Sequence, residues 1–432
     1  MRGSGQIHAQ RPPPPQTTLR RFSPGWLALG LVALGWLASA PEASAQGGVM
    51  RLGNMYFNLQ AYFEAEYNDN INYSNANRQS DIILRPGFQI GSSYQVTQLN
   101  TLSLDLGISY QQYLFHSSLS SYNSFASISP SSQLAYTIII DDFTIKVYDA
   151  FSYAVQPNNA VGYNTSTNTA VLAVTQYARF TNQIGFNVDW NLDRKILYAG
   201  AYRYDVFPTN SEFNTLRSTQ YTGLAGMRYI ISPTVTLGLG VTYTANSYSV
   251  NFNNNSGAWF VGPSIVWQPN SKWTFNASGG YIFYSFQNTG TNGDMSQPST
   301  WVGTFSASQQ INSKISHGIT FSRTSSYGYI SNTLDINRVA YQLQWQFRPK
   351  WTANFWTYYE QGDASGGNVT TGIGNQTVVQ SYHKWAISPG VQYQLNPNAT
   401  VYGSYEYADN ISSISVQTYN RNRIIIGLRY QF

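Results

Sequence analysis

The sequence contains no cysteine, and only 10% of its 432 residues are charged. The absence of cysteine excludes disulfides, thiolate metal sites and a cysteine nucleophile. An ordinary soluble domain has roughly 25% charged residues, so this chain must cover its surface differently. Aromatic residues make up 16% of the chain, and Ser, Thr and Asn are frequent between them. The composition is therefore unlike that of a soluble domain.

Long apolar runs are also missing after the first 45 residues. The longest run, residues 26–37, follows Arg20 and Arg21 and precedes Ala43-Ser44-Ala45. It is 12 residues long, whereas a membrane-spanning helix needs about 20. A basic segment, a short apolar run and a small-residue cleavage site are typical of a signal peptide. We predict a signal peptide over residues 1–45, cleaved before Gln46, and no transmembrane helix in the exported chain.

The excess of basic residues belongs mostly to this leader. Removing residues 1–45 takes away four arginines and Glu42, which lowers the net charge from +5 to +2. A nucleic-acid partner would need a concentrated basic face. The sequence therefore predicts no nucleic-acid partner, and it offers no motif for a cofactor.

After residue 50 the apolar residues alternate with polar ones and show no helical stripe. Segments of this kind are clearest at residues 57–67, 235–246, 338–348 and 423–432. Alternation over 9 to 14 residues has the length that a tilted barrel strand needs to cross a bilayer. One face of each segment is apolar and the other is polar or small, as expected of a wall between lipid and water.

The last strand ends on Tyr430 and Phe432, with Ile424 and Ile426 on the same face. A terminal aromatic after an amphipathic strand is typical of the closing strand of an outer-membrane barrel. We predict that Tyr430 and Phe432 form the signal that the barrel-assembly machinery recognises, and that lipid of the outer membrane surrounds the apolar face.

Short turns and long polar loops alternate along the chain. Bacterial outer-membrane barrels have short turns on the periplasmic rim and long loops outside. Both termini would then be periplasmic, and the turns imply about 18 strands, with 16 as an alternative. We predict a short segment at residues 46–54 and a single all-β, antiparallel up-and-down transmembrane β-barrel at residues 55–432. The short turns are expected at residues 97–100, 141–142, 191–194, 232–233, 269–271, 312–314, 348–350 and 396–398.

A barrel in lipid must leave no free sheet edge, so its first strand must pair with its last. Glu64 and Glu66 lie on the polar face of the first strand, and Arg423 lies on the polar face of the last. We predict a carboxylate–guanidinium contact across this seam. The alternative is that the charges are solvated independently in the lumen.

Tryptophans near the strand ends fit two interfacial belts, in which a ring buries its body and keeps its polar edge wet. Sugar-stacking platforms are the alternative. Trp356 and Tyr358 lie on the polar face with Glu360 and are better candidates for lumen contacts. We expect Trp190, Trp267, Trp273 and Trp351 in the periplasmic belt and Trp259, Trp301 and Trp385 in the outer belt.

Tyr67-Asn68-Asp69-Asn70-Ile71, followed by Ser80-Asp81 and then residues 83–88, resembles the first hairpin of the outer-membrane β-barrel porins. Some members of that family accompany exopolysaccharide or capsule export genes. The resemblance covers about thirty residues, together with the closing Tyr430-Gln431-Phe432. It implies a barrel, and it also implies polysaccharide as a possible partner. It supplies no catalytic residue.

Catalytic and metal-binding sites have few candidate residues. After the leader the only histidines are His116, His317 and His383. Nucleophilic catalysis needs a base within reach of an activated hydroxyl and an orienting group behind it. The three histidines are far apart in the sequence and match no metal-ligand spacing. We predict no enzyme activity and no metal site.

Charges on the wall of a barrel set its ion preference. A barrel of 16 to 18 strands is wide enough to leave an aqueous channel. Basic residues exceed acidic ones on the polar face, which favours a weak anion preference; alternatively, the charges pair and only rigidify the wall. The basic set is Arg85, Lys146, Arg179, Arg203, Arg228, Arg338, Arg348, Lys384, Arg423 and Arg429, and the acidic set is Glu64, Glu66, Asp105, Asp189, Asp205, Glu360 and Glu406.

The sequence thus predicts a bacterial outer-membrane channel for passive diffusion of small hydrophilic solutes. Two alternatives are a component of exopolysaccharide or capsule export, and a structural or adhesive barrel plugged by a loop such as 157–175 or 362–380. The sequence specifies neither the solute nor the oligomeric state.

Overall fold

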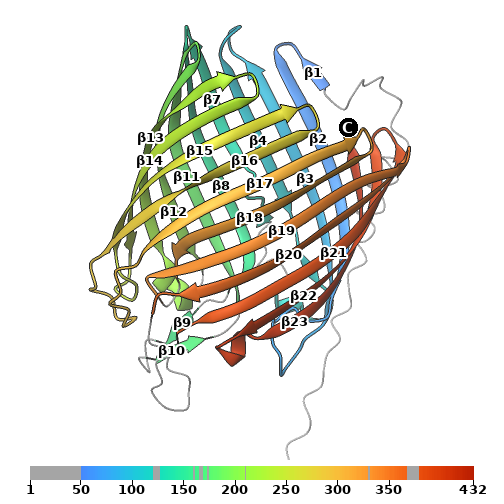
Figure 1. Ribbon diagram of the computed structural model, residues 1–432. Helices are drawn as coiled ribbons and strands as arrows, with labels where there is room; N and C mark the ends of the chain where they lie inside the picture. Colours follow the sequence, from blue (N-terminus) through green and yellow to red (C-terminus); the bar gives the residue numbers. More distant parts are fainter. Residues whose placement is uncertain are drawn as a thin grey trace, which may run out of the picture. The chain divides into compact units, whose positions relative to one another are not determined.

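The computed structural model describes residues 50–119, 127–158, 161–164, 169–172, 175–209, 211–328, 331–366 and 379–432. Eighteen long strands in this part of the chain form a closed antiparallel barrel, which confirms the predicted fold class (Figure 1). The predicted signal segment at residues 1–45 lies outside the described residues. No helix among the described residues has the length and hydropathy needed to cross a bilayer.

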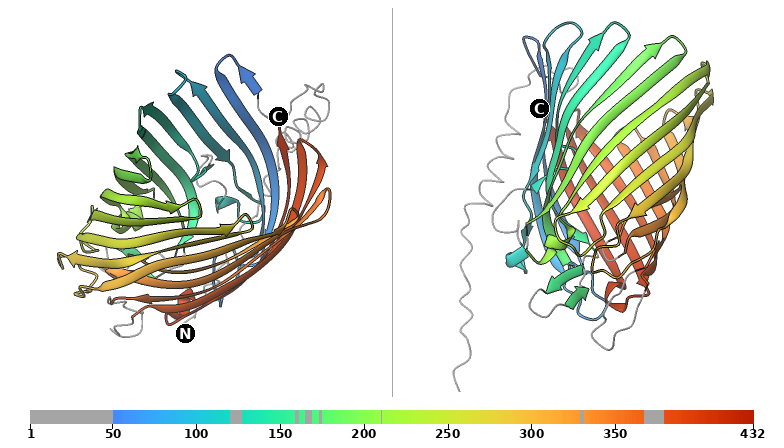
Figure 2. Two further views of the ribbon diagram at one scale, coloured as in Figure 1. Left: turned by 45° about the horizontal axis from the view of Figure 1, so that its top comes forward. Right: turned by 90° about the vertical axis from the view of Figure 1, so that its left-hand side faces the viewer.

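The barrel strands follow one another around the wall in chain order, each paired with the next (Figure 2). Shorter elements lie at the rims or extend a barrel strand. The barrel strands are β2 (Met55–Asn68), β3 (Asp81–Gln95), β4 (Thr101–Ser109), β7 (Gln133–Ile140), β8 (Phe143–Asn158), β11 (Thr175–Leu192), β12 (Lys195–Pro208), β13 (Ser218–Ser232), β14 (Val235–Tyr248), β15 (Ser256–Asn270), β16 (Trp273–Phe286), β17 (Ser299–Asn312), β18 (Ile315–Tyr327), β19 (Thr333–Arg348), β20 (Trp351–Ala364), β21 (Ser381–Asn396), β22 (Ala399–Ser412) and β23 (Tyr419–Gln431). The shorter elements are β1 (Met50–Leu52), β5 (Gln112–Tyr113), β6 (Ser127–Ile128), β9 (Val161–Asn164), β10 (Thr169–Leu172) and the 3₁₀ turns η1 (Ser117–Leu119), η2 (Ser211–Leu216) and η3 (Ser415–Gln417).

The seam between β2 and β23 closes the barrel. Their ladder extends from Gln60 opposite Gln431 to Asn68 opposite Arg423. The Phe432 backbone N–H adds a 2.9 Å hydrogen bond to the Leu59 carbonyl. Closure removes the unpaired edge that lipid cannot solvate.

The expected short turns all lie at one rim, which is also the rim of β1 and of the C-terminal end of β23 (Figure 1). Three of them share one chemistry, because an Asn side chain accepts hydrogen bonds from backbone N–H groups two and three residues further on. Asn270 accepts from Lys272 and Trp273, and Asn312 and Asn396 do the same in their turns. Such Asx turns fix the hairpins locally. We call this edge the turn rim and the opposite edge the loop rim.

The outward face is apolar, with Leu239 55% exposed and Ile426 61% exposed. Trp259 and Trp267 bound this face on β15 and pack on Tyr243 and Phe275 respectively. They are eight residues apart, about 27 Å along a strand. A tilt of about 40° reduces this to roughly 20 Å of height, close to the apolar band of an outer-membrane barrel. The two tryptophans therefore lie at the heights expected of the two belts.

Polar side chains join several loops at the loop rim. The buried Asp294 carboxylate accepts hydrogen bonds from the Asn332 backbone N–H at 2.7 Å and the Ser365 hydroxyl at 2.8 Å. Asn254 donates to the Asp294 carbonyl and to the Asn332 side chain, both at 2.8 Å. We call Asn254, Asp294, Ser296, Asn332 and Ser365 the loop knot. It fixes four loops to one another.

Both loops considered as plugs, residues 157–175 and 362–380, lie partly outside the described residues. Within the predicted 46–54 segment, β1 pairs with the start of β2 through a turn at Gly53, whose φ is +62°. This positive φ suits glycine, which carries no Cβ.

Candidate functional site

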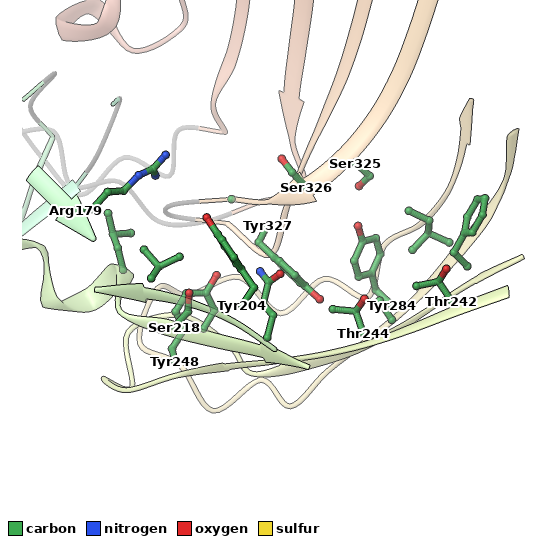
Figure 3. A pocket seen from close by; sticks show the side chains of 17 residues that line it. Arg179, Tyr204, Ser218, Thr242, Thr244, Tyr248, Tyr284, Ser325, Ser326 and Tyr327 are labelled. Carbon is green, nitrogen blue, oxygen red and sulfur yellow. The ribbon is translucent and has the colours of Figure 1, made fainter. Parts of the chain in front are cut away.

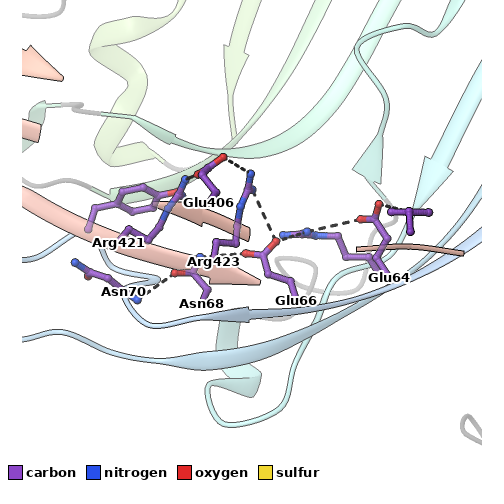
Figure 4. A network of polar contacts seen from close by, with 10 residues as sticks. Glu64, Glu66, Asn68, Asn70, Glu406, Arg421 and Arg423 are labelled. Carbon is purple, nitrogen blue, oxygen red and sulfur yellow. Dashed lines mark hydrogen bonds and ion pairs between the residues drawn. The ribbon is translucent and has the colours of Figure 1, made fainter. Parts of the chain in front are cut away.

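A charged network crosses the inner face of the barrel at the seam (Figure 4). Glu66 is 1% exposed and accepts from the Arg85 guanidinium at 2.5 Å and from the Asn68 amide at 3.1 Å. Arg423 Nη1 lies 3.9 Å from Glu66 Oε2 across the β2–β23 seam. The predicted carboxylate–guanidinium contact between the first and last strands is therefore confirmed for Glu66.

The network continues away from the seam in both directions. Glu406 on β22 accepts from Arg423 at 2.8 Å and from Arg421. Glu64 accepts from the Tyr402 hydroxyl at 2.6 Å and lies 3.9 Å from Arg85. Each carboxylate thus has a guanidinium in reach, which repays part of the cost of taking charges out of water.

A second group of paired charges lies on β19, β20 and β21. Glu360 accepts from the Tyr382 hydroxyl at 2.8 Å and lies 3.9 Å from Arg338. The Arg338 guanidinium lies 4.1 Å from the centre of the Tyr358 ring, and Trp356 stacks on the same ring with 5.4 Å between centroids. We call the inner face of β2, β3 and β19–β23, with both groups, the seam wall.

The opposite wall, β11–β18, has a different chemistry, and we call it the hydroxyl wall. The half of this wall nearer the loop rim borders a cavity of about 540 Å³ (Figure 3). Tyrosine, serine and threonine hydroxyls line this cavity, together with some apolar side chains. Of the predicted site residues, Arg179 lies at its edge. Apart from Arg179, the side chains that line this cavity are uncharged.

Two further cavities lie nearer the turn rim. One, of about 500 Å³, is lined by amides and hydroxyls such as Gln342, Gln344 and Asn354, with Trp356 at its border. The other, of about 380 Å³, contains Arg228, whose guanidinium lies 3.2 Å from Asp189 and over the Tyr198 ring. Both side chains of this ion pair are more than 40% exposed.

The prediction that Arg203 and Asp205 face the lumen is wrong. Tyr204 and Val206, their neighbours on β12, line the inner cavity, so strand alternation turns Arg203 and Asp205 outward. The Arg203 guanidinium lies 5.7 Å from the ring centre of Tyr221, which is 53% exposed. Asp205 accepts from Arg203 at 2.8 Å and so partners the arginine on the outer face.

The sequence reading also missed residues of the network. Arg421 is one of them, although it lies two residues before Arg423 on β23 and fits the same alternation. Starting the predicted C-terminal strand two residues earlier, at residue 421, would have included this arginine. Tyr402, which also lies under the Arg429 guanidinium at 5.3 Å, carried no signal, because a tyrosine suits either face of a barrel.

The three histidines lie apart, as the sequence suggested. His116 Nδ1 is 2.8 Å from the buried Asp81 carboxylate, His317 pairs with Gln309, and His383 pairs with the Tyr359 hydroxyl. Among the described residues no group of three or more His, Asp or Glu side chains could hold a metal ion.

A closed 18-strand barrel with an apolar belted exterior and a polar interior defines an integral protein of the bacterial outer membrane. No family model matches the sequence, and no curated protein matches it either.

Solved structures do match, and they are outer-membrane porins. A BenF-like porin from Pseudomonas fluorescens Pf-5 aligns with a TM-score of 0.50 and 13% identity, over 88% of this chain and 100% of that chain. Pseudomonas aeruginosa OccK2 (OpdF) in complex with glucuronate aligns with a TM-score of 0.47 and 13% identity, over 88% and 99%. Pseudomonas aeruginosa OccD3 (OpdP) aligns at 0.47 and 11%, over 90% and 94%. The alignment with the BenF-like porin shows that the two chains share the barrel fold, as the resemblance implied.

Proposed function

We propose that this protein is an outer-membrane channel through which small hydrophilic solutes pass by diffusion. The observation that supports this most is the inner surface itself, where three cavities lined by both polar and apolar side chains lie along the barrel. An 18-strand barrel is wide enough to enclose water. Passage then needs no turnover, and the width of the lumen and the chemistry of its wall decide which solutes cross.

The paired charges limit the field that a solute meets. Glu66, Glu406 and Glu360 each have an arginine within 4 Å, so these ion pairs add little net charge to the seam wall. Lys146, Arg348, Lys384 and Arg429 have no carboxylate within ion-pair distance among the described residues. Unpaired positive groups on a pore wall favour anions. We therefore propose a weak anion preference that depends on these residues more than on the network.

The two rims give the proposed orientation. The short turns and both barrel ends lie at the turn rim, and bacterial barrels place that rim in the periplasm. Tyr430 and Phe432 lie there with an edge-to-face ring contact of 5.1 Å. We propose that this end meets the assembly machinery and that the loop knot faces the outside. Nothing in the described residues favours polysaccharide export or a plugged barrel, so neither is proposed.

Single-channel recording in planar lipid bilayers tests the proposal. Folded protein should give stable open steps in concentrated salt, and a salt gradient should give a reversal potential of the sign expected for anions. A barrel that is folded but carries no current contradicts the channel, and a cation-selective reversal potential contradicts the charge argument alone. The matched control is the double variant Asp189→Asn/Arg228→Gln, which removes one charge of each sign and should leave the selectivity unchanged.

A further inference from the structure

The backbone ladder between β17 and β18 stops before the loop rim. Its last pair towards that rim is Gly303 opposite Arg323. Both strands continue further towards the loop rim, β17 to Ser299 and β18 to Tyr327. The ladders on either side continue, since β16–β17 reaches Ser299 and β18–β19 reaches Tyr327. The wall is therefore split between β17 and β18 from Gly303 to the loop rim, beside the exposed side chain of Trp301.

The end of β18 at the loop rim bends towards the lumen at this split. The Tyr327 ring makes edge contacts with Tyr284 and Phe286 of β16, at centroid distances of 6.0 and 6.4 Å. Ser325 and Ser326 line the 540 Å³ cavity together with Tyr327 (Figure 3). The split thus borders the inner cavity on one side and the belt on the other.

Arg323 closes the split with its side chain. Its guanidinium donates to the Trp301 carbonyl and the Thr300 hydroxyl of β17, each at 3.1 Å. It also donates to Asp335 at 2.9 Å and Asn337 at 3.1 Å, both on β19. The Trp301 carbonyl would meet Ser325 if the ladder continued in register, so the arginine replaces a missing backbone bond. The Arg323 side chain can break these hydrogen bonds by changing its rotamer, whereas breaking backbone ladder bonds would unfold the strand.

The cavity at the split is lined by both apolar and polar side chains. Val206, Leu216, Phe260 and Ile282 line it beside tyrosine and threonine hydroxyls. Arg179 at its edge supplies a cationic group. An apolar lining with a few polar groups is the usual lining of a binding site for a ligand that has an apolar body.

We propose that the split between β17 and β18 is a lateral opening through which a single-chain amphiphile with a carboxylate head moves between the inner cavity and the outer leaflet. The apolar chain lies against Phe260 and Ile282, and the head remains near Arg179 and the hydroxyls. Arg323 is the positioning residue that holds the opening shut. This route goes beyond the axial passage of hydrophilic solutes and does not depend on it.

A disulfide across the split tests the route, because the chain has no cysteine of its own. Val302→Cys/Thr324→Cys places one thiol on each side, at the pair that would follow Gly303 and Arg323 in register. The protein is placed in vesicles with a lipopolysaccharide outer leaflet, and transfer of nitrobenzoxadiazole-labelled dodecanoate from water into the membrane is timed. The oxidised variant should lose the protein-dependent transfer, and reduction should restore it.

The matched control is Ser306→Cys/Thr320→Cys, which joins residues already paired in the same ladder. Oxidation of this control should leave dodecanoate transfer unchanged, and salt conductance should survive in both variants. Transfer that continues at full rate through a variant shown by mass spectrometry to be cross-linked overturns the proposal. Loss of salt conductance in all variants would contradict axial diffusion. The dodecanoate transfer could still be measured and would still test the lateral route.

Arg323→Gln provides a second test that needs no disulfide. Glutamine cannot make the four bonds of the guanidinium fork, so transfer of the labelled dodecanoate should become faster. The control Arg228→Gln removes an arginine of the inner wall far from the split and should leave that rate unchanged. An unchanged rate in folded Arg323→Gln overturns the assignment of Arg323, even if the cysteine pair fails to oxidise.

Discussion

The two walls of the lumen differ in how their polar groups are satisfied. On the seam wall Glu66 and Glu406 share Arg423, and Glu66 also binds Arg85, so carboxylates and guanidiniums of four strands form one connected set. On the hydroxyl wall the cavity is lined by neutral groups such as Thr242, Thr244 and Tyr284. A charge that is buried away from water needs an opposite charge or hydrogen bonds from the protein, whereas a hydroxyl exposed to lumen water can bond to that water. The comparison indicates that the ion pairs of the seam wall stabilise the closing strands, whereas the 540 Å³ cavity lies beside the hydroxyls of the other wall.

Glu66→Ala should have the largest effect. It leaves Arg85 and Arg423 without their shared carboxylate at a site that is 1% exposed, and breaking a buried pair costs about 3–5 kcal/mol. Urea titration of the barrel refolded in vesicles, followed by tryptophan fluorescence, measures the free energy of unfolding. Asp189→Asn is the control on the hydroxyl wall, because its exposed pair should contribute only about 0–1 kcal/mol. Equal losses would contradict the difference between the walls.

Asp294→Asn should have a smaller effect, confined to the loops. An amide cannot accept all the bonds that the carboxylate takes from Asn332, Ser296 and Ser365, and an unmade buried bond costs about 1–3 kcal/mol. Hydrogen exchange should become faster in the loop knot while the barrel strands keep their protection. Faster exchange in the strands of both walls would show instead that the knot supports the whole barrel.

The loop knot should also respond to pH. Burial raises the pKa of Asp294, but hydrogen bonds from Asn332, Ser296 and Ser365 outweigh it and hold the pKa below the ordinary value of 3.8. The carboxylate therefore contributes stability fully above that value, and the contribution is lost as pH falls through the lower folded pKa. Single-channel records should show more loop-driven current noise only below about pH 4. Asp294→Asn should show that noise at every pH.

Arg429→Gln should change selectivity without changing stability much. Arg429 lies on the Tyr402 ring and has no carboxylate within ion-pair distance among the described residues, so its charge acts on the lumen directly. The reversal potential in a salt gradient should shift towards cations. The double variant Asp189→Asn/Arg228→Gln should give no shift. A larger shift from the double variant would place the selectivity on the hydroxyl wall.

Arg203→Gln should have the smallest effect on the pore. Its guanidinium contacts Tyr221 on the outer face, so the reversal potential and the conductance should match those of the unmodified protein. A clear shift in the reversal potential would mean that Arg203 acts on the lumen after all and would contradict the placement of β12.

Most of the barrel could be predicted because strand alternation and turn chemistry are local. The Asn270, Asn312 and Asn396 turns are each fixed by bonds within four residues. Glu66 and Arg423 could be matched because closure forces the first strand beside the last. On β12 the prediction was wrong, because Tyr202 and Tyr204 suit either face, and a shift of one residue exchanges every side chain between lumen and lipid.

The sequence alone determined a membrane barrel, its turns and the rim at which its ends meet, because each depends on the order of neighbouring residues. Only the tertiary structure decided which carboxylate meets which guanidinium, and that Arg203 faces outward while Arg323 bridges β17 and β19. Those contacts depend on the stagger between strands and on the inward bend of β18. Both are set by closing eighteen strands at once, and no single strand encodes them.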